Sequence, residues 1–348
     1  MRRIAQHSQR AGSRFKGRRF KVQPMKAIQC VEWGDPSKLV LADLPLPEPG
    51  AAQVRIRIAA AGVNFPDALI VQKKYQLQPK LPFVPGTEVA GTVDAVGEDV
   101  RHLKVGDRVI AFVGVGGFAE YVCAPAALAV AIPDGVSDEV AAAFTLTYAT
   151  SHHALFDRGQ LKAGETLLVL GAGGGVGLAA VELGKVAGAR VIAAASSADK
   201  LAAAKQHGAD ESINYSAMDL REAVKNLTGG NGADVIYDPV GGPGTVAAVR
   251  SLAWRGRLLI VGFAQGEIPQ IPANLLLLKS ASAVGLFWGE FAKREPKANL
   301  AMLRELFAWL AEGKLKPHVS HVYPLAETPR ALQALLARNV IGKLVVRP

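Results

Sequence analysis

The spacing of apolar and polar residues changes its character partway along the chain. Between residues 25 and 135, apolar residues occur in short alternating or β-branched runs that are separated by glycine, proline and aspartate. This pattern predicts a series of short strands, which is typical of a compact β-barrel or sandwich. The strands are expected in MKAIQCVEW (25–33), KLVLADLPLP (38–47), AQVRIRIAAAGV (52–63), VAGTVDAVGE (89–98), DRVIAFVG (107–114) and GFAEYVCAP (117–125).

From about residue 140, helical periodicity alternates with strand-like apolar runs, which indicates βαβ units and a parallel sheet. The predicted elements are ETLLVLG (165–171), GLAAVELGKVAGA (177–189), RVIAAAS (190–196), DKLAAAKQHGA (199–209), ADVIYDPV (233–240), GTVAAVRSLA (244–253) and GRLLIVGF (256–263). Beyond residue 291 the pattern gives a helix and two or three strands, among them VSHVYPL (319–325) and GKLVVRP (342–348). We expect this last part to complete the first unit.

The length of the chain fits about two domains, since it has 348 residues, half of them hydrophobic. No run of about 18 uncharged apolar residues is present, so we expect no transmembrane helix. The run that comes nearest, residues 275–287, is interrupted by Lys279.

The net charge of +10 resides almost entirely in residues 1–24, which hold eight basic and no acidic side chains. Without them the chain carries 32 basic and 30 acidic residues. We expect a disordered basic tail with three possible origins: an organelle-targeting peptide, a misassigned start with the true one at Met25, or an arm that binds nucleic acid. The start at Met25 fits best, because MKAIQCVEWG reads like the beginning of a first strand. A nucleic-acid partner is therefore not expected.

Two cysteines, Cys30 and Cys123, lie far apart and form no CxxC motif. They indicate neither a disulfide framework nor a structural zinc lobe, and they favour a reducing compartment. We expect the cytoplasm, or the mitochondrial matrix if residues 1–24 are a transit peptide.

The segment ETLLVLGAGGGVGLAAV (165–181) is the strongest chemical signal. An apolar strand ends at Gly171 and a glycine run turns the chain into a helix near Val176, with small residues at 172, 174 and 177 in the G-x-G-x-x-G spacing. Such a turn lets the backbone approach a pyrophosphate and directs unsatisfied helix N–H groups at the anion. With a strand before it, a helix after it and a second strand at the right distance, the motif predicts a dinucleotide site. We expect cofactor contacts from Gly173, Gly174, Gly175 and Val176.

The second strand of this unit indicates which dinucleotide binds. Where NAD sites commonly place an acidic residue, this chain has Ala195, followed by Ser196, Ser197 and Lys200. Two hydroxyls and a cation suit a 2′-phosphate, so we predict NADPH rather than NADH. Ser196 can instead cap the next helix, and Asp199 is expected to stabilise the N-terminus of that helix.

At this point the chain resembles the medium-chain dehydrogenase/reductase superfamily. GVNFPD (62–67), PFVPGTEVAGTV (82–93), GGFAEYV (116–122) and LTYATSHHAL (146–155) resemble its zinc-independent quinone oxidoreductase branch. The resemblance covers about residues 25–348. It implies an α/β protein with a GroES-like β-barrel catalytic domain (25–145 and 291–348), a doubly wound Rossmann NADPH-binding domain (146–290), an active site between them and a homodimer.

The resemblance also bears on metal chemistry. Zinc-dependent members of the superfamily carry a cysteine where this chain has Asn64, and G-H-E where it has Gly86, Thr87 and Glu88. An amide and a hydroxyl are poor replacements for a thiolate and an imidazole, so we expect no catalytic zinc. Glu88 is then expected to be structural, accepting hydrogen bonds around the Asn64 loop, because a buried carboxylate without partners is costly.

Matching motif positions give the remaining candidate residues. The resemblance implies catalytic roles near the nicotinamide and substrate for Asn64, Tyr75 and Thr150. It implies cofactor contacts for Tyr215, the backbone of Gly262, Phe263 and Ala264, Leu286, Phe287 and Lys343. Several of them have a plain structural alternative: a turn asparagine at 64, a packed aromatic at Tyr75, a threonine satisfied by backbone carbonyls, dimer packing at 286–288 and a surface lysine at 343. Thr147 is the second choice to Thr150, and Lys74 stands where many relatives have glycine.

Without zinc, oxidation of ordinary alcohols is not expected, and hydride must go to an acceptor that is already electrophilic. The leading hypothesis is an NADPH-dependent quinone reductase. The alternative is reduction of the C=C bond of α,β-unsaturated carbonyls or enoyl-CoA thioesters. A remote alternative is a non-enzymatic NADPH-binding or RNA-binding protein.

Overall fold

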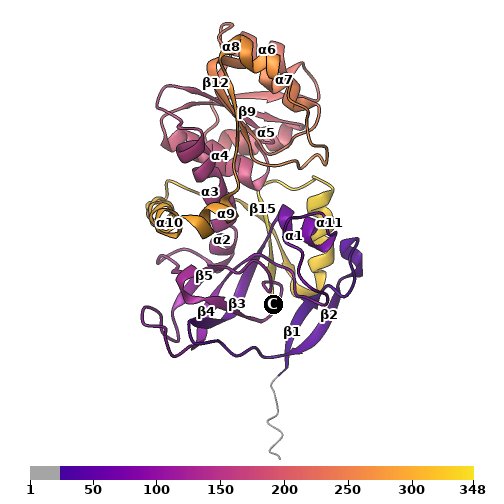
Figure 1. Ribbon diagram of the computed structural model, residues 1–348, viewed down its shortest axis with the longest axis vertical. Coiled ribbons are helices and arrows are strands. Elements are labelled where there is room, and N and C mark those ends of the chain that lie inside the picture. Colours follow the sequence, from indigo (N-terminus) through magenta and orange to yellow (C-terminus); the bar gives the residue numbers. More distant parts are fainter. Residues whose placement is uncertain (1–23) are drawn as a thin grey trace, which may run out of the picture.

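The computed structural model describes residues 24–348, which form two lobes stacked along the longest axis of the molecule (Figure 1). The predicted basic tail, residues 1–24, lies outside the described residues except for Pro24. No helix within residues 24–348 is both long enough and apolar enough to cross a membrane.

The lower lobe of Figure 1 is built on a mainly antiparallel sheet with the strand order β14-β15-β3-β4-β5-β7, and β6 pairs with β3 beside this path. The chain's last strand, β15, pairs with β3, which confirms that the C-terminal segment returns to the first unit. The domain boundaries near residues 145 and 291 remain a prediction. The strands of this lobe are β1 (Pro24–Gln29) and β2 (Val40–Pro45), which form a separate pair, and β3 (Gln53–Val63), β4 (Glu88–Val96), β5 (Arg108–Phe112), β6 (Tyr121–Pro125), β7 (Ala129–Ala131), β14 (Val319–Pro324) and β15 (Lys343–Arg347).

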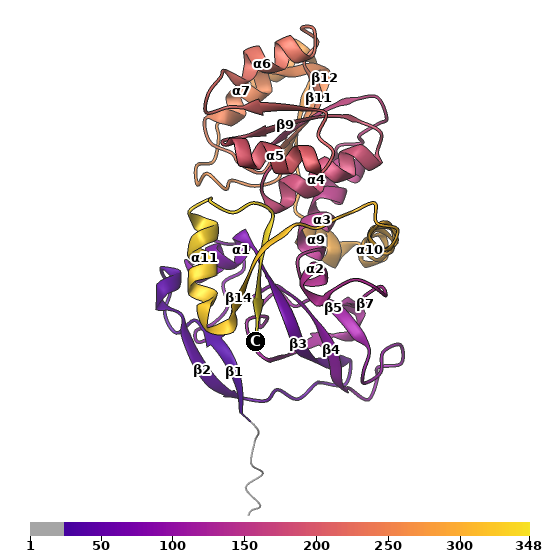
Figure 2. The ribbon, with the colours of Figure 1, turned by 180° about the vertical axis from the view of Figure 1, so that it is seen from behind.

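Short helices cover the lower lobe. Helices α1 and α11 lie side by side at the same edge, beside β15, in the views of Figures 1 and 2. The helices of this lobe are α1 (Phe65–Val71), α2 (Asp138–Ala142) and α11 (Thr328–Leu336), with single 3₁₀ turns at Pro36–Lys38, Ala126–Leu128 and Leu325–Glu327.

The upper lobe contains a parallel sheet with the order β10-β9-β8-β11-β12-β13. The order reverses beside β8, which is the doubly wound arrangement whose ligands bind where the strand order switches. The α/β fold class predicted from the sequence is confirmed. The elements are β8 (Thr166–Leu170), α4 (Gly175–Val186), β9 (Arg190–Ala195), α5 (Ala198–Gln206), β10 (Glu211–Asn214), α6 (Leu220–Leu227), β11 (Ala233–Asp238), α7 (Gly244–Arg250), β12 (Leu252–Ile260), α8 (Ala273–Lys279) and β13 (Ser282–Gly285).

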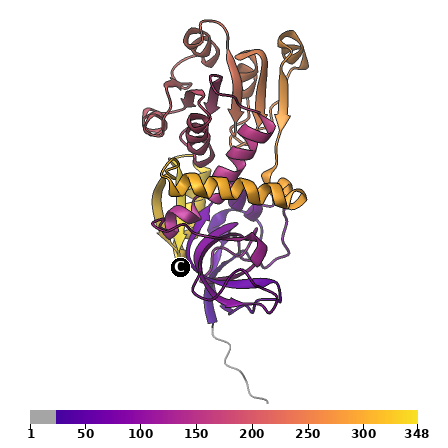
Figure 3. The same cartoon turned by 90° about the vertical axis from the view of Figure 1, so that its left-hand side faces the viewer.

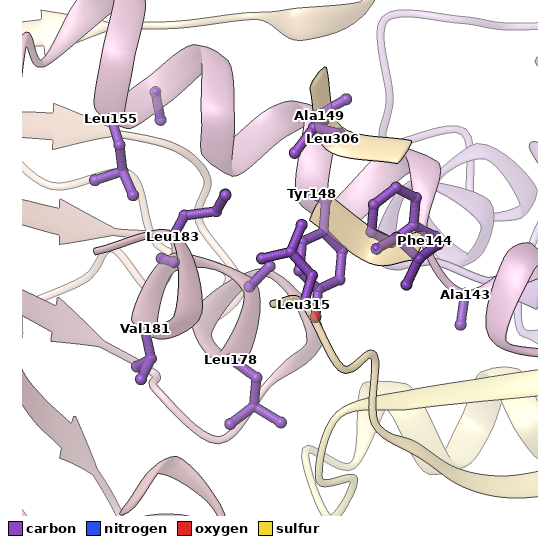
Figure 4. Close-up of a cluster of buried hydrophobic side chains, with 14 of the residues drawn as sticks. Ala143, Phe144, Tyr148, Ala149, Leu155, Leu178, Val181, Leu183, Leu306 and Leu315 are labelled. Carbon is purple, nitrogen blue, oxygen red and sulfur yellow. The ribbon is translucent and has the colours of Figure 1, made fainter. Parts of the chain in front are cut away.

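Three helices and a π-helical turn join the lobes: α3 (Thr145–His152), the turn His153–Arg158, α9 (Trp288–Arg294) and α10 (Pro296–Ala311). Figure 3 shows α10 crossing the molecule between the two lobes. The Phe144 ring stacks on Tyr148 at a centroid distance of 4.5 Å and packs against Phe307 at 5.3 Å. This buried apolar cluster (Figure 4) continues into Leu178 and Leu183 of α4, so one core holds both lobes together.

Candidate active site

The glycine turn has the geometry that the sequence predicts. Strand β8 ends at Leu170, Gly171 takes a φ of 59°, and Gly174 caps the N-terminus of α4. A Cβ at Gly177 would lie 2.2 Å from the carbonyl oxygen of Gly171, so only glycine lets the helix pack this closely on the turn. The helix N-terminus and the open Cα of Gly174 together form a cradle that an anion can approach.

The C-terminal segment closes one side of this turn. The Gly342 N–H donates to the Gly173 carbonyl at 2.8 Å, and Gly174 and Gly342 form an isolated β-bridge. Gly342 itself has a φ of 65°. A Cβ at Gly175 would lie 2.9 Å from Cδ of Lys343, so the sequence motifs GAGGGVG and GK meet in space although they are far apart in the chain.

A buried polar cluster lies next to this junction. Asn64 Nδ2 donates to Glu88 Oε1 at 2.9 Å and to Thr87 Oγ1 at 3.2 Å. The other Glu88 oxygen accepts the backbone N–H of Leu146 at 2.8 Å. Glu88 has no exposed surface and Asn64 only 3 %. The prediction that Glu88 accepts hydrogen bonds around the Asn64 loop is therefore confirmed.

Lys343 supplies the positive charge of the cluster. Its ammonium donates to Glu88 Oε1 at 3.0 Å, to the Val63 carbonyl at 3.0 Å, and to Asn64 Oδ1. The residue is 5 % exposed, so the alternative of a surface lysine is wrong. The Lys343–Glu88 pair could not be predicted from the sequence, because the two residues are 255 positions apart and meet only where β15 pairs with β3.

Asp67 lies under the same loop and has no exposed surface. One oxygen accepts the Asn64 backbone N–H at 2.8 Å, and the other has no hydrogen-bond partner among the described residues. Burial raises the pKa of this carboxyl to about 7, while the Asn64 hydrogen bond and the Lys343 charge act in the opposite direction. The Asn64 contact ties the Asp67 carboxylate to the backbone of the loop.

The residues predicted for the 2′-phosphate gather at the end of β9. Strand β9 ends at Ala195 and α5 begins at Ala198, with Ser197 as its N-cap. Ser196 therefore precedes the cap position, and Asp199 lies in the first turn of α5 as expected. Burial raises the pKa of the Tyr215 phenol, and the nearby Ser196 hydroxyl lowers it. The Tyr215 N–H donates to the carbonyl of Ala195 at 3.2 Å, so Tyr215 lies next to Ser196.

Arg338 completes this group and was missed by the sequence reasoning. The Lys200 ammonium donates to the Arg338 carbonyl at 2.7 Å, which ties α5 to the loop after α11. Burial and, less strongly, the Arg338 charge lower the pKa of Lys200. The available signal was a basic residue directly after the amphipathic pattern ALQALLA and four positions before Gly342.

Tyr75 and Phe287 meet from opposite lobes. Their rings pack edge-on with centroids 6.5 Å apart, and Phe287 remains 49 % exposed. Burial raises the pKa of Tyr75, and the Asp67 charge raises it further. Leu286 is half-buried beside them. The alternative for residues 286–288 was packing in a dimer interface. Trp288 packs in the core of its own chain, where it is 5 % exposed and its indole N–H donates to Asn299.

The two threonines of α3 differ in their surroundings. Thr147 is buried, and its hydroxyl donates to the carbonyls of Ala143 and Phe144, both at 3.1 Å. Its Cγ2 nevertheless lies near Gly175, beside the glycine turn. Thr150 is half-buried one turn further along α3, and its role stays a prediction.

Residues Gly262, Phe263 and Ala264 follow β12, which lies two strands from β8 in the sheet. The Ala264 N–H already donates to the Pro239 carbonyl at 3.1 Å, and the Gly262 N–H points to the Asp238 carbonyl at 3.4 Å. The expected contacts of these backbone groups with a carboxamide stay a prediction. Because the N–H groups of Gly262 and Ala264 already have acceptors, the backbone of Phe263 is the best candidate for such a contact.

His152 and His153 lie away from this cluster. His152 and His153 form the end of α3 and the start of the π-helical turn, where they contact Glu305 and Asp157. Within residues 24–348, no group of three or more histidine, cysteine, aspartate and glutamate side chains is placed to hold a metal.

Comparison with known proteins agrees with this arrangement. Residues 50–134 match the model of the alcohol dehydrogenase GroES-like domain, and residues 175–305 match that of the zinc-binding dehydrogenases. The quinone oxidoreductase-like protein 2 homolog of Nematostella vectensis is 41 % identical over 325 residues, covering 92 % of this chain and 88 % of the relative. The chain belongs to the medium-chain dehydrogenase/reductase superfamily, in its quinone oxidoreductase branch.

Solved structures of this branch superpose on the whole described chain. Escherichia coli quinone oxidoreductase complexed with NADPH has a TM-score of 0.87 and 30 % identity, covering 93 % of this chain and 100 % of that one. A mycobacterial protein complexed with NADPH has a TM-score of 0.87 and 36 % identity, with the same coverage. The family membership makes this protein an oxidoreductase with a GroES-like and a Rossmann domain.

Proposed function

We propose that this protein transfers hydride from NADPH to quinones without a metal ion. The observation that carries the proposal is the buried cluster at Asn64, Glu88 and Lys343. The positions that would hold zinc in zinc-dependent members carry an amide and a hydroxyl, and the lysine ammonium bonds directly to the amide oxygen. Because this cation would repel a second one and the amide groups are already hydrogen-bonded, the residues do not fit a catalytic zinc.

The chain's residues fit NADPH. The glycine turn offers backbone and a helix N-terminus to the pyrophosphate, and a Cβ at Gly173 would lie 2.5 Å from Lys200, which accounts for the small residue there. Ser196, Lys200, Tyr215 and Arg338 surround the end of β9 and suit a 2′-phosphate. The cofactor supplies the hydride, and the protein would hold the cofactor at the point where the strand order of the parallel sheet reverses.

The other residues define the acceptor. Asn64 and Lys343 lie next to the glycine turn, and their hydrogen bonds with each other and with Glu88 fix the loop that would border the acceptor. Tyr75 and Phe287 provide aromatic surface from the two lobes, against which a planar ring can stack. A quinone needs no Lewis acid, since its ring is already electrophilic. Thr150 is proposed as a further contact on α3.

We also propose that the protein forms a homodimer through the outer edge of the upper sheet. Strand β13 is the last strand in the sheet order, and the neighbouring helix α8 has no buried residue. Leu277 and Leu278 of α8 are 77 % and 68 % exposed. An unpaired strand edge beside exposed leucines suits pairing with a second copy.

A reducing compartment is the proposed location, the cytoplasm first and the mitochondrial matrix second. Both cysteines are free thiols, Cys30 buried and Cys123 half-buried, and burial raises the pKa of each. Neither has the lowered pKa of a redox-active thiol.

The proposal is tested by measuring cofactor oxidation with purified protein in the presence of a chelator. NADPH and NADH are each offered with a simple quinone, an enone and an enoyl-CoA thioester. The expected result is quinone-dependent oxidation with a kcat/KM for NADPH at least about tenfold above that for NADH. Faster turnover of the enone or the thioester would move the substrate class to conjugated double bonds. No oxidation with any acceptor would overturn the proposed activity.

A further inference from the structure

A second buried carboxylate lies in the helix that follows the glycine turn. Glu182 is in the middle of α4, is 5 % exposed, and has no role in the cluster around Asn64. An acidic residue on the buried face of a helix is costly unless its oxygens find donors. The groups that contact it come from three other parts of the chain.

Both oxygens of Glu182 are hydrogen-bonded. Oε1 accepts from Nδ1 of His207, the residue that ends α5, at 2.6 Å. Oε2 accepts the Tyr148 hydroxyl of α3 at 2.7 Å and the Lys316 backbone N–H at 3.0 Å. Because Glu182 is a charged acceptor in a dry environment, these bonds are stronger than bonds between neutral groups.

The Lys316 contact reaches the segment that leads into β14, which we call the return segment (residues 316–318). Its last residue, His318, packs edge-on against the His207 ring with centroids 5.8 Å apart. The His318 carbonyl accepts the Lys343 backbone N–H at 2.8 Å. The return segment therefore connects Glu182 with the residue that binds Asn64 and Glu88.

The return segment also touches the glycine turn. A Cβ at Gly342 would lie 2.4 Å from the His318 carbonyl oxygen, so Gly342 packs directly on it. A cavity of about 10 Å³ is lined by Tyr148, Pro317 and His318 on one side and by Gly175, Gly342 and Lys343 on the other. So little space leaves no room for the return segment to shift without moving the turn.

We propose that Glu182 is a positioning residue for the cofactor. It fixes the return segment on α4, and the return segment in turn holds Gly342 and Lys343 against the glycine turn. The backbone that would bind the pyrophosphate and the Asn64–Lys343 pair are thereby held at fixed relative positions before the cofactor binds. This inference rests on the proposed function, since it assumes that a dinucleotide binds at the turn.

The test compares Glu182→Gln with wild type in fluorescence titrations of NADPH and in competition by adenosine 2′-monophosphate. This fragment carries the 2′-phosphate but no 5′-phosphate, so it can occupy the Ser196 and Lys200 end without reaching the glycine turn. Loss of the charge should weaken NADPH binding about tenfold and the fragment by less than about twofold. The KM for NADPH should rise in parallel, while kcat at saturating NADPH stays within about twofold, because bound cofactor restores the arrangement. Tyr148→Phe, which removes one of the three bonds, should give a smaller change of the same kind.

Glu165→Gln is the matched control. Glu165 is a carboxylate of the same lobe whose oxygens bind Arg257 at 2.9 and 2.7 Å, away from the return segment. This variant should lower the melting temperature without changing the NADPH affinity. The inference is overturned if Glu182→Gln binds NADPH like wild type, or if NADPH and the fragment weaken equally. Failure of wild-type protein to bind NADPH would instead overturn the proposed function, and the inference with it.

Discussion

At the scale of single residues, the candidate site contains a buried pair of opposite charges. Lys343 and Glu88 are almost completely buried and contact each other at 3.0 Å. Removing one partner of such a pair leaves an uncompensated charge, which costs more than the intact pair contributes. The pair therefore keeps the Asn64 loop, β4 and β15 together only as long as both members are present.

Lys343→Met should lower the free energy of unfolding by about 3–5 kcal/mol, because Glu88 is left buried without its cation. The double variant Lys343→Met/Glu88→Gln should be less destabilised than Lys343→Met alone. Urea unfolding of the four proteins of this cycle measures the coupling. Additive effects of the two substitutions would contradict the pairing.

Asp67 predicts a pH dependence of stability. Its pKa is raised by burial to about 7, so between about pH 4 and pH 7 the folded protein holds a proton that the unfolded chain has released. The free energy of unfolding should therefore fall as pH rises through this window, by up to about 1.4 kcal/mol per pH unit. Asp67→Asn should remove this part of the dependence of the unfolding free energy on pH. Urea unfolding between about pH 4.5 and pH 7.5 measures it. An unchanged slope would show that Asp67 is ionised throughout.

Arg338 predicts cofactor preference. Arg338→Gln should weaken NADPH about tenfold relative to NADH, because a charged hydrogen-bond donor to the 2′-phosphate is lost. Arg330→Gln is the control, since Arg330 lies on α11 and pairs with Glu327 at 2.9 Å. Kd values for both cofactors measure the effect. Equal weakening of NADPH and NADH would place Arg338 elsewhere than at the 2′-phosphate.

The residues of the site were partly predictable from the sequence. Asn64, Thr87 and Glu88 stand in a recognisable motif, and the need of a buried carboxylate for donors predicted the role of Glu88. The donors to Glu88 were not predictable in full, since Lys343 reaches it through the long-range pairing of β15 with β3. Arg338 reaches the end of β9 through the loop after α11, where its carbonyl binds Lys200. Glu182 gave no sequence signal, because the helical pattern around it is otherwise apolar.

At the scale of elements, the unit β8–turn–α4 carries the candidate cofactor site. Its strand, glycine run and helix were predicted within a few residues of the observed bounds, because each has a strong local pattern. Elements with weak local patterns were missed: β7 and β10 have three and four residues, and α1 begins with Phe65 and Pro66. Short elements of this kind form because the surrounding fold stabilises them.

Gly177 is expected to be indispensable for this unit. Gly177→Ala would place a methyl group 2.2 Å from the Gly171 carbonyl oxygen, so α4 must move away from the turn. We expect a loss of stability of about 1–3 kcal/mol or more, together with weaker NADPH binding. Gly244→Ala at the start of α7, where nothing lies within 4 Å, is the control and should be neutral or slightly stabilising. Thermal unfolding and cofactor titration measure both effects, and a stable Gly177→Ala that binds normally would contradict the close packing.

At the scale of the whole molecule, two sheets are held in one arrangement by the buried cluster around Phe144, Tyr148 and Leu306 (Figure 4). The reversal of strand order beside β8 places the glycine turn at the edge that faces the lower lobe, where β15 and the Asn64 loop meet it. The alternation of helical and strand-like patterns predicted the parallel sheet. The pairing of β15 with β3 could be expected only in outline, since strand neighbours are not written in local sequence.

The proposed dimer is tested at the exposed edge of the upper lobe. Leu277→Lys should convert a dimer of 36.6 kDa chains into monomers, because it places a charge on the apolar face of α8. Val105→Lys, at a 60 % exposed position of the lower lobe, should leave the dimer intact. Light scattering coupled to size-exclusion chromatography measures the mass. A monomeric wild type, or dissociation by both variants, would contradict the proposed interface.

The most direct test of the central claim is the rate of NADPH oxidation by metal-stripped protein with a quinone as the sole acceptor. We predict turnover that saturates with quinone, is unchanged by added zinc, and falls when Asn64→Ala removes the amide next to Lys343. Activity that depends on added zinc, or that appears with simple alcohols and not with quinones, would contradict the account.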